Sequence, residues 1–388
     1  MPKEIIILGS TGSIGKTTLK IIRKNKKDFN VKLLSTNNNI STIYNQALEF
    51  KVKIVVIKNY KKINKKVFLK FNKKKIKIFS TYEQALKNIR KKVYYTINGI
   101  SGINGLEPTI QIIPFTQNIA IANKESIICG WKFIDRSLKR YKTNFIPIDS
   151  EHFSIWSLLK DEKINNVNKI YLTASGGPFL NQKLSNLKNI KSRYAIKHPN
   201  WSMGKKISVD SATMMNKIFE VIEAVNIFNL KLNKFEIIIH PRSYIHAIIK
   251  FKNGISKILV HDTSMQVPIF NSLYLNNETK VYDNKKFNFK MLNGINFIKP
   301  DKIKFPFLKL LKYINVNNTY FEVILVSIND ALVNKYLKDE ITFISLQKNL
   351  FKLIKHPYFT KYYKSSPNNI NDIKIMVNRV NTYMKKNY

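Results

Sequence analysis

A glycine-rich loop directly after an apolar run constrains the fold of this chain more than any other feature. The run is Ile5–Leu8, and the loop that follows is Gly9-Ser10-Thr11-Gly12-Ser13-Ile14-Gly15, at the start of a helical stretch. Such a loop brings backbone N–H groups and a helix N-terminus onto a pyrophosphate, as in dinucleotide-binding folds. The spacing G-x-x-G-x-x-G is a variant of the usual fingerprint, so a purely structural strand-to-helix turn remains the alternative.

Short β-branched runs alternate with helical stretches through the N-terminal part of the chain. We expect strands at 5–8, 31–35, 53–57, 93–98, 119–122 and 144–148, and helices at 17–24 and 40–50. Strand–helix alternation indicates a parallel, doubly wound sheet.

The remaining residues have a mixed pattern. Five of the six histidines and three strand-like runs lie in the middle of the chain, and the C-terminal pattern is helical. The predicted fold class is α/β: a Rossmann-like doubly wound parallel sheet at 1–149, an α+β catalytic and dimerisation domain at 150–275, a polar linker at 276–300 and a small C-terminal helical domain at 301–388.

The charge of the chain is strongly unbalanced. Lys and Arg number 67 against 24 Asp and Glu, a formal net charge of +43. Clustered cations would favour nucleic-acid binding. The lysines are scattered, however, and no RNA-recognition, zinc-finger or helix-turn-helix pattern surrounds them. We interpret the charge as a drifted surface composition that could speed capture of an anionic substrate, and we predict no nucleic-acid partner.

Location and redox state follow from simple counts. No apolar run reaches the ~18 residues that a membrane helix requires, and the first strand leaves no room for a signal peptide. The single cysteine, Cys129, excludes an internal disulfide. It has no activating neighbour and is interpreted as a small buried apolar residue. We expect a cytoplasmic enzyme without a membrane partner.

Carboxylates from two distant segments predict a metal site. Asp149 and Glu151 follow an apolar run, and on an extended segment both could face one way. Glu220 would come from a helix that begins near Ser211, one turn after Asn216. Three carboxylates suit Mg²⁺ or Mn²⁺ acting as a Lewis acid on a hydroxy-ketone. The alternative is that Asp149 caps a helix and Glu220 is a solvated position.

A phosphate site is predicted beside these acids. Ser211, Asn216 and Lys217 offer a hydroxyl, an amide and an ammonium, and Ser175 and His198 could add two donors. The loop 198–204 contains Pro, Trp, Met and Gly, a mixture that fits a lid over a flat ring. Ordinary packing of Trp201 and Met203 is the alternative.

The end of the second strand discriminates between nicotinamide cofactors. A site for NAD usually places Asp or Glu there to hold the ribose 2′-hydroxyl. Here the segment is Ser35-Thr36-Asn37-Asn38-Asn39, which contains no acid. A 2′-phosphate would meet neutral donors, so NADP is favoured over NAD.

With these motifs in place, the chain resembles the 1-deoxy-D-xylulose 5-phosphate reductoisomerase family. The likeness runs in order from residue 1 to about 268. The segments that carry it are 9–15, 102–109, 122–126, 149–152, 172–179, 198–204, 206–220 and 240–246.

The resemblance implies a homodimer that uses NADPH and Mg²⁺, Mn²⁺ or Co²⁺. The family's metal ligands correspond to Asp149, Glu151 and Glu220, which with Lys124 form the implied catalytic set. Its contacts with a small phosphosugar substrate correspond to Lys124, Ser150, Glu151, Ser175, His198, Ser211, Asn216, Lys217 and Glu220. Its NADPH contacts correspond to Thr11, Gly12, Ser13, Ile14, Asn39, Asn123, Glu125 and Gly204.

The implied chemistry has two stages. The metal chelates the carbonyl and hydroxyl oxygens of 1-deoxy-D-xylulose 5-phosphate while its skeleton rearranges to an aldehyde, and NADPH then reduces the aldehyde to 2-C-methyl-D-erythritol 4-phosphate. The chain departs from the family pattern at Asn37-Asn38, where a glycine and a basic residue are usual. It also departs at 264–266 and 326–330, which we expect to lie away from the chemistry.

Two other functions are considered. Another NADP-dependent Rossmann oxidoreductase, such as a semialdehyde reductase, would need a nucleophilic cysteine, for which only Cys129 is available. A basic nucleic-acid-binding protein without catalysis would show a steep salt dependence of binding.

Overall fold

The computed structural model describes residues 1–188, 190–275, 280–282, 289–314 and 318–388. It separates into two compact units. The first consists of 1–127, 132–149 and the described part of 265–283, and the second of 128–131, 150–264 and the described residues after 288. Among the described residues no helix is long and apolar enough to cross a membrane.

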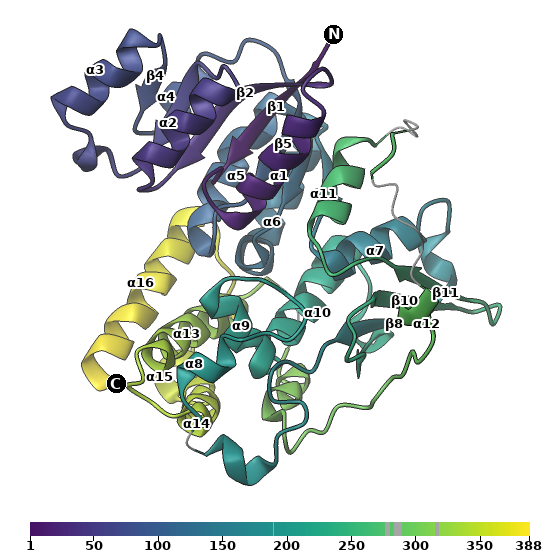
Figure 1. Cartoon of the computed structure of the whole chain (residues 1–388). Helices are drawn as coiled ribbons and strands as arrows, with labels where there is room; N and C mark the ends of the chain where they lie inside the picture. The colour runs from purple at the N-terminus through teal and green to yellow at the C-terminus, as the bar shows by residue number, and fades with distance from the viewer. Residues whose placement is uncertain (189, 276–279, 283–288, 315–317) are drawn as a thin grey trace. The chain divides into compact units, whose positions relative to one another are not determined.

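A seven-stranded sheet organises the first unit (Figure 1, purple to blue). Its order is β4-β3-β2-β1-β5-β6-β7, and every neighbouring pair is parallel. The strands are β1 (Lys3–Leu8), β2 (Phe29–Thr36), β3 (Ile54–Ile57), β4 (Lys77–Phe79), β5 (Val93–Asn98), β6 (Thr116–Ile121) and β7 (Asn144–Pro147). The predicted doubly wound sheet is confirmed; the three-residue edge strand β4 is additional, being too short to give a periodic signal.

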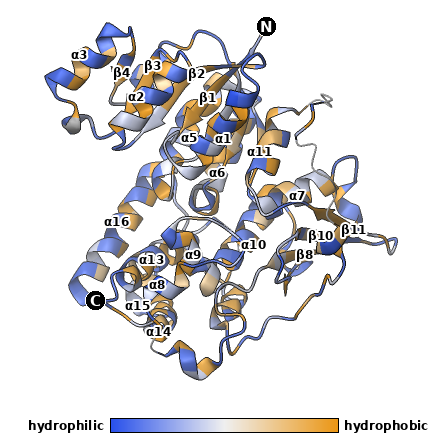
Figure 2. Cartoon of the chain, in the orientation of Figure 1, coloured by the Kyte–Doolittle hydropathy of each residue, from blue (hydrophilic) through white to orange (hydrophobic). Residues whose placement is uncertain are grey.

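The helices of this unit alternate with its strands, except α11, which joins the unit from later in the chain. They are α1 (Ser13–Lys24), α2 (Ile40–Glu49), α3 (Lys65–Lys73), α4 (Tyr82–Leu86), α5 (Leu106–Ile112), α6 (Lys124–Tyr141) and α11 (Gln266–Leu273). Asparagine side chains cap α2, α3 and α6: Asn39 accepts from the Thr42 N–H, Asn64 from the Val67 N–H and Asn123 from the Ser126 N–H. Ile5–Leu8 are fully buried, and hydrophobic colour follows the strands of this sheet in Figure 2.

The second unit contains a four-stranded sheet with order β11-β10-β8-β9. The strands are β8 (Val167–Ala174), β9 (Phe235–Ile239), β10 (Ile245–Phe251) and β11 (Ser256–Val260). β10 runs antiparallel to both β8 and β11, whereas β8 and β9 are parallel. Helices α7 (Ser150–Leu158) and α10 (Met215–Phe228) cover one face, where Ile155 and Val221 pack with Ile170, Leu172 and Ile249.

The other helices of the second unit are α8 (Ser192–Ala195), α9 (Lys205–Ala212), α12 (Phe289–Leu292), α13 (Tyr320–Leu337), α14 (Phe343–Ile354), α15 (Pro357–Thr360) and α16 (Ile370–Asn387). α13 begins with a capping box between Thr319 and Glu322 and packs against α14 and α16. The expected helical C-terminal region is therefore present.

Local structure differs from expectation in two places that matter for the site. Glu151 does not lie on an extended segment; it occupies the first turn of α7, because the chain becomes helical at Ser150 directly after β7 and Asp149. Ser211 does not open the helix of Glu220. It belongs to α9, and Met214, in the left-handed conformation at φ 64°, separates α9 from α10.

The domain division also differs in detail. Residues 265–273 group with the first unit, because α11 packs against α1. Of the predicted linker, 276–279 and 283–288 lie outside the described residues; further on, Ile298 pairs with Ile239 in an isolated bridge. The four-part division of the chain stays a prediction.

Candidate active site

The glycine-rich loop joins β1 to the N-terminus of α1, as the sequence predicts. The Gly12 N–H donates to the Gly9 carbonyl at 3.0 Å, which closes the turn. A Cβ on Gly15 would lie 2.4 Å from the Ser10 Cα, so only glycine lets α1 approach the loop so closely. The first turn of α1 carries no acidic residue. The backbone N–H groups of Ser13 and Ile14 lie in the first turn of α1. This helix N-terminus therefore favours binding of an anion.

The other predicted cofactor residues of the first unit lie at carboxyl ends of the sheet strands. Thr11 Oγ1 lies 2.8 Å from Thr36 Oγ1 at the end of β2, and Asn39 caps the helix that follows. Asn123, after β6, donates to the Ile100 carbonyl at 2.5 Å, and Glu125 lies beside it in the first turn of α6. Ligands of doubly wound sheets bind at this edge. Gly204 belongs to the second unit, and its part in cofactor binding stays a prediction.

Lys124 is the first residue of α6 and is buried. Its ammonium lies 2.9 Å from Asp149 Oδ2, at the end of β7. Adjacent strands β6 and β7 thus bring together two residues that the sequence separates by 25 positions. The pair ties a predicted catalytic lysine to a predicted metal ligand.

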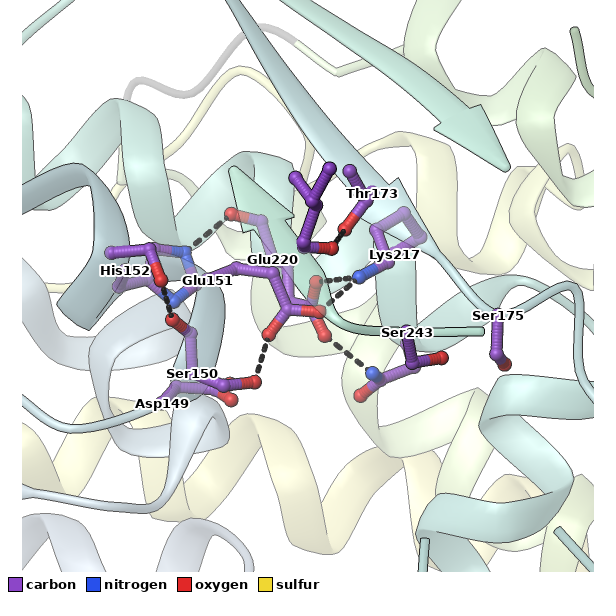
Figure 3. A network of polar contacts seen from close by, with 12 residues as sticks. Asp149, Ser150, Glu151, His152, Thr173, Ser175, Lys217, Glu220 and Ser243 are labelled. Carbon is purple, nitrogen blue, oxygen red and sulfur yellow. Dashed lines mark hydrogen bonds and ion pairs between the residues drawn. The ribbon is translucent and has the colours of Figure 1, made fainter. Parts of the chain in front are cut away.

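The Lys217 ammonium lies between two carboxylates (Figure 3). Its Nζ is 2.6 Å from Glu151 Oε1 on α7 and also contacts Glu220, one turn further along α10. Ser150 donates to Glu151 Oε2 at 2.6 Å, and the Asn216 amide donates to Glu220. The structure therefore gathers five predicted site residues from two helices that pack on the same sheet.

Two sets of side chains have the geometry of a cation site. In each, one ligand atom from every member lies within 4.8 Å of the others. The first set is Asp149, Glu151 and Glu220, as predicted, and the second is Asp149, His152 and Glu223. Asp149 belongs to both sets. The all-carboxylate set suits Mg²⁺ better, since this hard cation prefers oxygen ligands.

The electrostatics of the cluster favour the ionised forms that a metal requires. Burial alone would raise the pKa of Glu151, but the nearby Lys217 ammonium holds it well below its usual range. Burial would likewise lower the pKa of Lys217, but the carboxylates of Glu151 and Glu220 raise it. The ammonium and the carboxylates thus keep one another ionised although they are buried.

Ser175 and His198 form a second polar pair. His198 Nδ1 accepts the backbone N–H groups of Asn200 and Trp201 at 3.2 and 3.0 Å, so the neutral ring carries its proton on Nε2. That nitrogen lies 2.9 Å from Ser175 Oγ, which also accepts the Gly177 N–H at 3.0 Å. The Ser175 hydroxyl is left to donate its own proton. Burial, and then the charge of Lys217, lower the pKa of His198 to about 4.

Helix α9, which carries Ser211, is held by α13. The neighbouring Asp210 is buried and accepts from the Asn329 amide on α13 at 2.8 Å, while Lys206 pairs with Asp330 at 2.8 Å. Residues 329 and 330 thus contact the helix that carries Ser211, and whether 326–330 lies away from the chemistry stays a prediction. Nothing in the sequence pattern signals this contact.

Several buried residues around the cluster were not among the predicted site residues. His152 Nε2 lies 2.9 Å from the Glu220 carbonyl, and its Nδ1 lies 3.6 Å from Glu223 Oε2. His246 stacks on His261 with ring centroids 3.7 Å apart and meets the Trp201 ring edge-on at 5.9 Å. The concentration of histidines in the middle segment was the only sequence signal for them.

Fold and site together define a Rossmann-type dinucleotide-binding enzyme with a carboxylate site for a divalent cation. Three family models match the chain: "1-deoxy-D-xylulose 5-phosphate reductoisomerase" at residues 5–130, its C-terminal domain at 145–228, and "DXP reductoisomerase C-terminal domain" at 261–382. A reductoisomerase of Pelagibacter ubique is 50% identical over 96% of both chains, and one from a Wolbachia of Drosophila simulans is 40% identical over 89% of this chain and 88% of its own. The chain belongs to the 1-deoxy-D-xylulose 5-phosphate reductoisomerase family.

Solved structures agree with this assignment. The enzyme of Zymomonas mobilis in complex with NADPH superposes with a TM-score of 0.88 at 27% identity, covering 100% of this chain and 99% of that one. A reductoisomerase in complex with NADPH, fosmidomycin and magnesium gives a TM-score of 0.90 at 27% identity, over 99% and 98% of the two chains.

Proposed function

We propose that this chain converts 1-deoxy-D-xylulose 5-phosphate to 2-C-methyl-D-erythritol 4-phosphate with NADPH and a divalent metal ion. The observation that carries the proposal is the Glu151–Lys217–Glu220 cluster, next to Asp149, in a chain of this family. As a biosynthetic enzyme it would work in the cytoplasm.

Asp149, Glu151 and Glu220 would hold Mg²⁺ or Mn²⁺. Their oxygen atoms lie close enough to share one ion, and Glu151 is ionised. When bound, the ion polarises the carbonyl and hydroxyl oxygens of the substrate, which favours rearrangement of the carbon skeleton. Asn216 and Lys217 hold Glu220 in place from the same helix, while Lys124 would orient Asp149.

The phosphate of the substrate would bind to donors on three segments of the second unit. Ser175 can donate its hydroxyl proton, with His198 accepting backbone N–H groups behind it. Ser211, Asn216 and Lys217 would add a hydroxyl, an amide and an ammonium, which together suit a dianion. Because His198 is neutral at physiological pH, its Nδ1 can accept the two backbone N–H groups, and the ring proton stays on Nε2.

NADPH would bind along the glycine-rich loop and the carboxyl edge of the first sheet. Thr11, Gly12, Ser13 and Ile14 line the β1–α1 turn, and Asn39 and Asn123 follow neighbouring strands of the same sheet. When bound, the cofactor supplies hydride to the aldehyde, and the protein's part is to hold it there.

We also propose that the protein is a homodimer joined through the uncovered face of the second sheet. Ile258, Ile248 and Tyr171 are direct neighbours across three strands, so their side chains point to the same side of the sheet, away from the core of Ile170 and Leu172. Ile258 is 48% exposed, and Ile255 at the adjoining turn is 56% exposed. An apolar face of this kind suits a second copy of the chain.

The test is a direct assay. Purified chain, NADPH, Mn²⁺ and 1-deoxy-D-xylulose 5-phosphate are mixed, and loss of absorbance at the nicotinamide band is followed. Turnover that stops when the metal is chelated would support the proposal. No turnover with both cofactors present would refute it.

The alternative function, a Rossmann reductase with a nucleophilic cysteine, is not favoured, because the only cysteine of the chain is buried. Cys129 is 4% exposed within α6. We expect Cys129→Ala to keep full turnover in the same assay.

A further inference from the structure

The end of β2 offers no positive charge for the 2′-phosphate of NADPH. In Rossmann folds the adenosine ribose lies at this point, and an acid there selects NAD whereas a nearby cation accommodates NADP. Ser35 Oγ accepts the Gly9 N–H at 2.9 Å, which ties this end of the strand to the glycine-rich loop. The turn that follows is Asn37-Asn38-Asn39. These residues are neutral, so a positive charge for the 2′-phosphate must come from another segment.

The neighbouring strand ends at the same edge of the sheet. β3 runs parallel to β2 with Ile57 opposite Thr36. Beyond the strands the two chains stay joined: the Lys58 N–H donates to the Thr36 carbonyl, and the Asn59 N–H to the Asn37 carbonyl, both at 3.0 Å. The Asn59 amide also donates to Asn38 Oδ1 at 2.9 Å. Lys58 therefore lies directly beside the turn that lacks a cation.

The side chain of Lys58 lies near Tyr82, whose hydroxyl reaches the end of β2. Its ammonium lies 5.7 Å from the centre of the Tyr82 ring, and the Tyr82 hydroxyl donates to Ser35 Oγ at 3.1 Å. Lys58 is exposed, and no ion pair joins it to a carboxylate of the described residues. Its own segment cannot supply one, because residues 50–82 contain no Asp or Glu. The charge is thus available to an anionic ligand.

We propose that Lys58 supplies the cation that binds the adenosine 2′-phosphate and makes this chain prefer NADPH over NADH. The inference rests on the proposed function and deepens its cofactor site. Asn37 and Asn38 add amide donors, and no carboxylate from the β2–α2 turn opposes the phosphate. The positive charge thus comes from the end of β3 rather than from the turn after β2.

The test measures binding, not turnover. Dissociation constants for NADPH and for NADH are obtained by fluorescence titration of the wild type and of Lys58→Ala. We expect the NADPH constant to rise about tenfold, the loss expected for one hydrogen bond to a charged group, while the NADH constant stays the same. Lys58→Arg should keep most of the preference, since the charge is retained.

Lys53 provides a matched control. It precedes β3 at the opposite end of the strand and is also exposed, so Lys53→Ala removes the same charge away from the ribose. Its two dissociation constants should match the wild type. An unchanged NADPH constant in Lys58→Ala, or an equal loss in Lys53→Ala, would overturn the role of Lys58 while leaving the proposed function standing. A wild type that binds neither nucleotide would overturn both.

Discussion

Lys217 is the residue on which the site cluster depends. It is 4% exposed and contacts carboxylates of two helices, so removal of its charge would leave Glu151 and Glu220 facing each other in a buried setting. Burial, and then the same ammonium, lower the pKa of His198. One side chain thus acts on three predicted site residues.

Glu220→Gln should abolish metal-dependent turnover. The amide keeps the shape of the side chain but loses the charge of a direct ligand. The loss should exceed the roughly 10–100-fold that removal of an outer-shell partner costs. Turnover and NADPH binding are measured side by side, and NADPH should bind as it does to the wild type.

Glu223→Gln is the control for this prediction, because Glu223 belongs to the other set of possible ligands. Its effect on the metal concentration that gives half-maximal turnover should be the smaller of the two. A larger effect at Glu223 would move the ion to Asp149, His152 and Glu223.

Stability should fall in acid partly because of His198. Its pKa is about 4 in the fold against 6.5 unfolded, so the unfolded chain binds the extra proton first. The stabilisation from neutral His198 is complete above pH 6.5 and is lost as the pH falls towards 4. Urea unfolding of the wild type and of His198→Asn at several pH values in this range measures it.

The asparagine oxygen can still accept the N–H groups of Asn200 and Trp201, so the variant should fold. Its free energy of unfolding should depend less on pH than that of the wild type. Parallel curves between pH 4 and 6.5 would contradict the prediction.

Residue types at the site were largely predictable from sequence, because few chemistries bind a divalent cation or a phosphate. Asp149, Glu151, Glu220 and Lys217 could be singled out as acids and a base in apolar stretches. His152, His246 and His261 could not, since a buried histidine has no periodic or compositional signature that separates it from a ligand.

At the scale of elements, the break between α9 and α10 determines how Ser211 and Glu220 face the site. The chain turns at Met214, and the Ser175–Gly177 turn packs against the end of α9. A Cβ on Gly177 would lie 2.9 Å from the Ser211 carbonyl oxygen and 3.0 Å from the Ala212 Cα. Close approach of two backbones therefore holds the turn that carries Ser175 against the end of α9, which carries Ser211.

Gly177→Ala should disturb both stability and substrate binding. Its φ of +67° would cost an alanine about 1–2 kcal/mol, and the contact with α9 would add to that. We expect a lower free energy of unfolding and a raised KM for the phosphosugar, measured by denaturant titration and steady-state kinetics.

Gly254 offers a control, because its φ is also positive but no atom lies close to the position of an added Cβ. Its φ is +89°, and nothing lies within 4 Å of a Cβ placed there. Gly254→Ala should lose only the backbone contribution and keep its KM. Equal effects in the two variants would show that contact with α9 is unimportant.

At the scale of the whole molecule, the proposed dimer depends on one face of a sheet. Ile258→Asp would place a charge on the exposed row formed with Ile248 and Tyr171. Because that row lies away from the core, the subunit should still fold. Light scattering should show a dimer for the wild type and a monomer for the variant at the same concentration; an unchanged mass would place the interface elsewhere.

Sequence alone determined the parallel sheet of the first unit and its glycine-rich loop, and it predicted the three carboxylates that lie close enough to share one cation. The reason is that buried parallel strands, phosphate-binding turns and hard cations each demand particular residue types at short range. Helix boundaries at Ser150 and Met214, the grouping of α11 with the first sheet and the support of α9 by α13 were decided only by tertiary structure. Those features depend on contacts between residues far apart in the sequence, and no local sequence pattern predicts such contacts.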